Sequence, residues 1–177
     1  MTEKKAEKPD HAETETLYPA LPPDIDDAVA RVLEAACDRN LMLATAESCT
    51  GGLLASLLTD VEGASHAFER GFVVYSEKAK CELLGIQQAD ITHCGAVSRT
   101  VAIAMAKGSI HSSEADIALS ITGFAGDGDE PGLVHFACAR RDGYVVHREE
   151  HFGDIGRGPI RLKCLRVGLQ MMSEALA

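Results

Sequence analysis

The sequence has too few basic residues for a protein whose main role is to bind nucleic acid. It holds 17 lysines and arginines against 27 aspartates and glutamates, which gives a formal net charge of −10. Proteins that bind DNA or RNA usually neutralise phosphates with a basic face, and a chain without one loses the free energy of counterion release. The same shortage excludes a polybasic membrane anchor. We therefore expect no direct nucleic-acid partner.

Long apolar runs are also missing. The longest fall well short of the roughly 20 residues that a membrane-spanning helix needs, and the first residues are too polar for a signal peptide. These absences predict a cytoplasmic protein without a membrane partner. Apolar residues still make up 46% of the chain, which is enough for one sizeable core and excludes global disorder. A length of 177 residues fits one domain of ordinary size.

Common metal-binding and redox motifs are absent as well. The six cysteines contain no C-x-x-C pair, and we expect all of them to be reduced, as in a cytoplasmic protein. His147 and His151 are four residues apart on an expected strand. That spacing separates the two side chains by about 13 Å along the strand, too far for them to share an ion. We therefore expect no metal site.

Composition changes near residue 23. Residues 1–23 are charged and polar and end in a proline-rich stretch, which predicts a flexible acidic tail before a folded domain at 24–177. The last residues of the tail that we expect to dock on the domain are Leu17, Tyr18 and Leu21. Hydrophobic spacing in the domain predicts helices at 24–40, 51–60, 76–84, 98–113 and 158–176. Strands are predicted at 41–46, 71–75, 116–122, 133–140 and 144–152.

Strands and helices alternate for most of the chain. This order predicts an α/β fold, a three-layer α/β/α sandwich with a mixed, mostly parallel sheet. Arg141-Asp142-Gly143 is a tight-turn signal, so the last two strands are expected to form a hairpin that adds an antiparallel strand. Ligands of such sheets bind beyond the carboxyl ends of the parallel strands. Three loops follow those ends, at 47–52, 75–80 and 122–126.

The first of these loops has the sequence Glu47-Ser48-Cys49-Thr50-Gly51-Gly52 and lies between a buried strand and a helix. The unpaired N–H groups at the start of that helix predict a site for a phosphate or an oxyanion, because the glycines allow a ligand close to the backbone. The serine, cysteine and threonine are candidate nucleophiles or donors. The alternative is that Ser48 or Thr50 only caps the helix.

The second loop offers a base, which a serine nucleophile needs. Lys80 lies about one helical turn beyond Tyr75, and burial would lower the pKa of its amine. The alternative is an exposed helix on which Lys78 and Glu82 form a solvated pair. The third loop, 122–126, is a Gly-x-x-Gly turn after an apolar strand, a geometry that lets a ligand lie against the backbone.

Four segments resemble the CinA C-terminal domain family: residues 46–52, 68–76 with Lys80, 95–98 and 122–126. The resemblance runs over most of the chain outside the tail. It implies a three-layer α/β/α fold and nicotinamide-nucleotide amidohydrolase activity, in which nicotinamide mononucleotide becomes nicotinate mononucleotide and ammonia. It implies no metal and no other cofactor. Because members of the family are often oligomeric, we also expect a homo-oligomer.

The resemblance places the catalytic serine at Ser48, the tyrosine at Tyr75 and the lysine at Lys80. In this hypothesis the serine attacks the carboxamide carbon, the lysine takes the serine proton, and the tyrosine orients the lysine or relays a proton. We expect a pyridine nucleotide to be bound by the first and third loops together with one nearby basic side chain. These substrate-binding residues are Glu47, Cys49, Thr50, Gly51, Gly52, Arg70, Thr122, Gly123 and Gly126.

The loop after Gly126 departs from the family pattern. It is shorter and more acidic, with Asp127 where a proline is expected and with Asp129 and Glu130 close behind. Carboxylates at this place would repel a substrate phosphate. The alternative function is therefore a divergent or catalytically silent nucleotide-binding module with a regulatory role.

Overall fold

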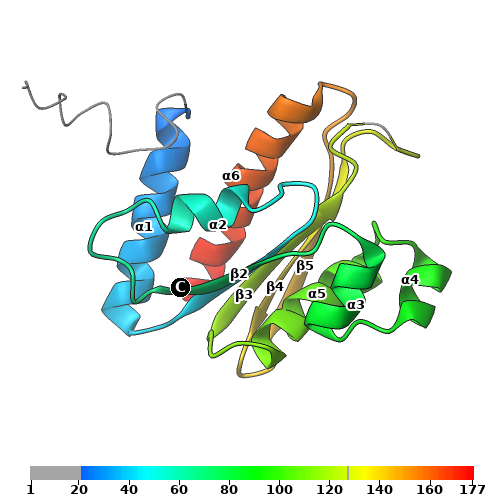
Figure 1. The fold of residues 1–177 in the computed structure, drawn as a ribbon. Coiled ribbons are helices and arrows are strands. Elements are labelled where there is room, and N and C mark those ends of the chain that lie inside the picture. The colour runs from blue at the N-terminus through cyan, green and yellow to red at the C-terminus, as the bar shows by residue number, and fades with distance from the viewer. Residues whose placement is uncertain (1–20, 127) are drawn as a thin grey trace, which may run out of the picture.

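The computed structural model describes residues 21–126 and 128–177 (Figure 1). The expected tail at 1–20, with Leu17 and Tyr18, lies outside this description, while Leu21 packs against the core as predicted. No helix in the described ranges is long and apolar enough to cross a membrane.

The sheet has five strands in the order β2-β1-β3-β4-β5. β1 pairs in parallel with β2 and with β3, whereas β4 is antiparallel to both β3 and β5. Only β4 therefore opposes the common direction, which confirms the mixed, mostly parallel sheet. The strands are β1 (Leu43–Glu47), β2 (Phe68–Val73), β3 (Ile117–Gly123), β4 (Leu133–Arg140) and β5 (Val145–His151).

Helices cover both faces of the sheet, which confirms the three-layer arrangement (Figure 1). One layer contains α1 (Pro23–Arg39), α2 (Leu53–Leu58) and α6 (Arg157–Leu176). The other contains α3 (Glu77–Leu84), α4 (Gln88–Cys94) and α5 (Arg99–His111). The sequence did not predict α4, because this short helix buries only Ile91 and shows no apolar periodicity.

The buried strands send alternate side chains into the two helical layers. In β3, Leu119 and Ile121 pack in the large core beneath α1 and α6, while Ala118 packs on the opposite side. Burial on both faces explains the continuous apolar character of this strand. β2 is an edge strand with exposed polar residues, so its first residues lack the apolar pattern that predicts a strand. It begins at Phe68, three residues before the predicted start at residue 71.

α5 holds α3, and hence Lys80, against the sheet through a close backbone approach. A Cβ atom at Gly108 in α5 would overlap the carbonyl oxygen of Leu84, the last residue of α3. The absence of a side chain at this position therefore lets the two helices meet.

We predict that Gly108→Ala lowers the free energy of unfolding by about 1–3 kcal/mol, because the added methyl group must push the end of α3 away. Chemical denaturation measures the change. Gly158→Ala is the matched control, since a Cβ atom there meets nothing within 4 Å and a helical alanine stabilises by up to about 1 kcal/mol. Equal stability of the two variants would contradict this account of the α3–α5 contact.

Candidate active site

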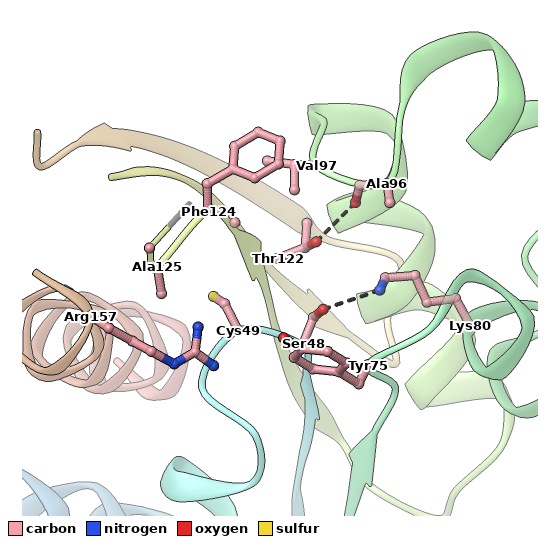
Figure 2. A pocket seen from close by; sticks show the side chains of 12 residues that line it. Ser48, Cys49, Tyr75, Lys80, Ala96, Val97, Thr122, Phe124, Ala125 and Arg157 are labelled. Atoms are coloured by element: carbon pink, nitrogen blue, oxygen red, sulfur yellow. Dashed lines mark hydrogen bonds between the residues drawn. The ribbon is translucent and has the colours of Figure 1, made fainter. Parts of the chain in front are cut away.

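The carboxyl ends of β1, β2 and β3 surround a cavity of about 250 Å³ (Figure 2). The second and third predicted loops and the start of the first loop meet here, and the first residue of α6 completes the wall. The lining residues are Ser48, Cys49, Tyr75, Lys80, Ala96, Val97, Thr122, Gly123, Phe124, Ala125, Gly126 and Arg157.

Ser48 and Lys80 are in direct contact in this cavity (Figure 2). Nζ of Lys80 lies 3.1 Å from the Ser48 hydroxyl oxygen and donates to the carbonyl oxygen of Val74 at 2.9 Å. The lysine side chain is only 2% exposed. The alternative of an exposed Lys80 is therefore wrong, although Lys78 and Glu82 do form a surface pair on the outer side of α3.

Burial lowers the pKa of Lys80 from its ordinary value of 10.5. Nearby groups such as Glu77 raise this pKa, but their effect is smaller than the cost of removing the ammonium charge from water. Within 21–126 and 128–177, no carboxylate forms an ion pair with Nζ. This environment favours the neutral amine more than water does, and the neutral form is the one that can accept a proton from a serine hydroxyl.

Glu47 points away from the cavity, which corrects its expected role in substrate binding. Its buried carboxylate accepts hydrogen bonds from the backbone N–H groups of Gly52, Leu54 and Ala55 at 3.1, 3.1 and 2.8 Å. A negative charge at the start of a helix is favourable because it compensates the unpaired N–H groups and the helix dipole. Glu47 thus fixes the end of β1 to the beginning of α2.

The backbone of the first loop is also less available than predicted. The N–H group of Gly52 bonds to Glu47, and that of Gly51 donates to the Ser48 carbonyl oxygen at 3.1 Å. Both glycines have positive φ, +65° and +90°, a conformation that side chains disfavour. The carbonyl oxygen of Thr50 accepts a bond from Arg161 at 2.7 Å. These three residues therefore shape the loop and do not line the cavity.

The positive charge in the cavity comes from an unexpected residue. Arg70 lies on the outer strand β2, where it pairs with Glu69 and donates to the Ser112 carbonyl oxygen at 2.8 Å. Arg157 lines the cavity instead. Its sequence signal is weak, because it is an arginine after Gly156 at the start of the last helix, and only the folded chain brings that start to this edge of the sheet.

The other predicted residues lie at the cavity with different surroundings. Tyr75 is 66% exposed, and in the described part of the chain it makes no hydrogen bond to Lys80, whose amine is held by Val74 instead. Cys49 is buried, and a hydrogen bond from Cys164 lowers the pKa of its thiol. Thr122 donates to the Ala96 carbonyl oxygen at 2.9 Å and so fixes the cavity wall.

Most of the chain is similar in sequence to proteins of one known family. Residues 25–176 match the CinA C-terminal domain family. The chain belongs to this family. It is 46% identical over 131 residues to the nicotinamide-nucleotide amidohydrolase PncC of Enterobacter agglomerans, a match that covers 71% of this chain and 79% of the relative. The protein of the same name from Escherichia coli K12 is 40% identical over 154 residues, which cover 84% of this chain and 90% of the relative.

Solved structures of the family share the fold. The competence/damage inducible protein CihA from Agrobacterium tumefaciens superposes with a TM-score of 0.85 at 43% identity, over 88% of this chain and 97% of the other. A competence damage-inducible protein from Klebsiella pneumoniae gives a TM-score of 0.81 at 31% identity, over 86% and 96% of the two chains. The architecture of this CinA C-terminal domain is therefore that of its solved relatives.

We predict that Glu47→Gln lowers the free energy of unfolding of this CinA C-terminal domain by about 2–3 kcal/mol, since it weakens charge-assisted bonds to backbone N–H groups. Hydrogen exchange of the Leu54 and Ala55 amides should become faster than in the unchanged protein. The exposed Glu82→Gln is the control and should change stability by less than about 0.5 kcal/mol. Unchanged exchange at both amides would refute the clamping role of Glu47.

Proposed function

We propose that this CinA C-terminal domain hydrolyses the carboxamide of nicotinamide mononucleotide to give nicotinate mononucleotide and ammonia. The observation that carries the proposal is the buried contact between Ser48 and Lys80, 3.1 Å apart in the cavity. The curated relatives named nicotinamide-nucleotide amidohydrolase PncC, 40–46% identical to this chain, support the choice of substrate.

The reaction proceeds through a covalent serine ester. The Ser48 hydroxyl oxygen bonds to the amide carbon while its proton passes to the neutral amine of Lys80. The C–N bond then breaks, Lys80 returns the proton to the departing nitrogen, and ammonia leaves. A water molecule attacks the ester, gives a proton to Lys80, and releases the carboxylic acid as Ser48 recovers its hydrogen. The sum is one amide and one water consumed, with one acid and one ammonia formed.

The burial of Lys80 suits this substrate in two ways. A protonated lysine cannot accept the serine proton, so a lowered pKa increases the fraction of the base that is in its active form. The nicotinamide ring of the substrate carries a positive charge as a pyridinium, which a neutral amine does not repel. A neutral amine has two N–H groups and one lone pair, so with one N–H donated to the Val74 carbonyl oxygen the nitrogen can turn its lone pair toward the Ser48 hydroxyl as it takes the proton.

Arg157 is suited to the substrate phosphate, since a guanidinium can bind phosphate oxygens through two parallel hydrogen bonds. Asp129 and Glu130 of the divergent loop line a neighbouring cavity, which shares Ala96, Val97 and Phe124 with the cavity of Ser48. Glu130 is also hydrogen-bonded to His151 at 2.6 Å. Asp127 lies outside the described residues.

We predict that Ser48→Ala and Lys80→Met each lower kcat for ammonia release by at least about 100-fold, the usual contribution of a positioned base or nucleophile. Calorimetry should still detect nicotinamide mononucleotide binding to both variants. Lys78→Met, on the exposed side of the same helix, is the control and should keep full activity.

In the unchanged protein, kcat/KM for ammonia release should rise with pH and level off below the ordinary lysine pKa of 10.5, because Lys80 must lose its proton before it can act as the base.

Retained ammonia release in either Ser48→Ala or Lys80→Met would overturn the assigned roles. Tight nucleotide binding by the unchanged protein, without ammonia release from nicotinamide mononucleotide, nicotinamide riboside or nicotinamide, would instead establish the silent binding module.

We predict that Arg157→Gln raises KM for nicotinamide mononucleotide by roughly 10- to 100-fold, because it removes charge-assisted bonds of about 1.5–3 kcal/mol. The KM for nicotinamide riboside, which has no phosphate, should change little. Arg39→Gln, on the exposed end of α1, is the control. An equal increase in KM for both substrates would show that Arg157 does not bind the phosphate.

A further inference from the structure

The hairpin of β4 and β5 brings three potential metal ligands together outside the proposed active site. His135 on β4 is directly opposite Glu149 on β5, and His147 lies two residues before Glu149 on the same face of the sheet. One ligand atom from each residue lies within 4.8 Å of the others. His147 is too far from His151 along its own strand to share an ion, but it is close to His135 on the neighbouring strand.

The distances among these atoms suit a tetrahedral ion. Nδ1 of His135 lies 3.1 Å from Nε2 of His147 and 3.4 Å from a carboxylate oxygen of Glu149. Ligands bound about 2.0–2.1 Å from a tetrahedral zinc ion are about 3.3 Å apart. Both separations from Nδ1 of His135 are therefore close to what a shared ion requires, and the proton that joins the two imidazoles in their hydrogen bond would leave when the ion binds.

The ligand chemistry favours a zinc-like ion. Two imidazoles and one carboxylate are a common set for divalent transition metals, whereas magnesium and calcium prefer oxygen ligands only. His135 is buried and its ring stacks on that of His147, and a neutral imidazole offers a nitrogen lone pair to such an ion. The Glu149 side chain is 45% exposed, which gives an ion access from solvent.

A second set of residues orients the carboxylate. The other oxygen of Glu149 lies 2.9 Å from Nε2 of His151, whose Nδ1 is bonded to Glu130 at 2.6 Å. Outer hydrogen bonds of this kind are typical of metal sites, where they hold a ligand in position. One nearby group opposes the binding of a cation. It is the guanidinium of Arg99 at the start of α5, whose positive charge acts on His147. The carboxylates of Glu149 and Glu130 offset that charge.

We propose that His135, His147 and Glu149 form a binding site for one divalent transition-metal ion of the zinc class. The site is separate from the cavity of Ser48 and Lys80, and the proposed hydrolysis does not require it. It lies beside that cavity, however, because His135 is the register partner of Thr122, which lines the cavity wall. A bound ion would join β4 to β5 and, through His151 and Glu130, would brace the loop that precedes β4.

The test is calorimetric titration of the full chain, first freed of metal by a chelator, with zinc chloride. We expect one ion to bind per chain. His147→Ala and Glu149→Gln should each weaken this binding at least 100-fold, since even the loss of an outer partner typically costs about 10–100-fold in affinity. His93→Ala, an exposed histidine on α4, is the matched control and should bind zinc as the unchanged protein does.

Two further measurements test whether the ligand variants are folded and whether the bound ion is tetrahedral. Thermal unfolding in metal-free buffer should show that His147→Ala and Glu149→Gln are folded, and the exposed position of Glu149 makes the second variant the safer of the two. Cobalt(II) bound to the unchanged protein should give the intense visible absorption of a tetrahedral site. The proposal is overturned by the absence of zinc binding, or by equal binding in the unchanged protein and both folded ligand variants.

Discussion

The buried carboxylate of Glu47 is the constraint on which the geometry of the candidate site depends. It ties the end of β1 to the first turn of α2 through three backbone N–H groups, so the intervening loop has little freedom. Ser48 is presented to the cavity because its neighbour is fixed in this way. The same bonds remove the start of α2 as an anion site, since its donors are already used within the chain. One residue thus supplies rigidity at the place where sequence patterns suggested ligand binding.

Glu47 and Lys80 show two different outcomes of burying an ionisable side chain. The carboxylate is surrounded by hydrogen-bond donors, which replace the water it has lost. The lysine amine has a carbonyl oxygen and a hydroxyl group as partners, and neither offers a full opposite charge. Releasing the proton is therefore easier here than in water. The fold thus produces rigidity from one buried group and a larger neutral fraction from the other.

The layer arrangement could be predicted because it depends on local pattern, whereas local pattern offered Ser48 and Lys80 only as candidates and the resemblance to the CinA C-terminal domain family joined them as a pair. Alternating strands and helices imply the sandwich, and the loops at strand ends indicate where a ligand binds. The errors arose where the direction of a side chain decides its role. Glu47 turns inward to a helix and Arg70 turns outward from an edge strand, whereas Arg157 reaches the cavity from the far end of the sequence. The predicted turn at 141–143 already implied the register that places His135 opposite Glu149, but only neighbours along one strand were compared as metal ligands.

The order of the sheet has a consequence for when the site comes into existence during folding. Ser48 follows β1, Lys80 lies on the helix after β2, and Thr122 lies near the end of β3. In the sheet, β1 lies between β2 and β3. Contacts between segments this far apart in sequence form slowly, because closing the long loops between them costs chain entropy before the contacts can stabilise the structure. No fragment that lacks one of these strands can assemble the cavity. The cavity is therefore a product of the pairing of β1 with both β2 and β3, and not of any single segment of the chain.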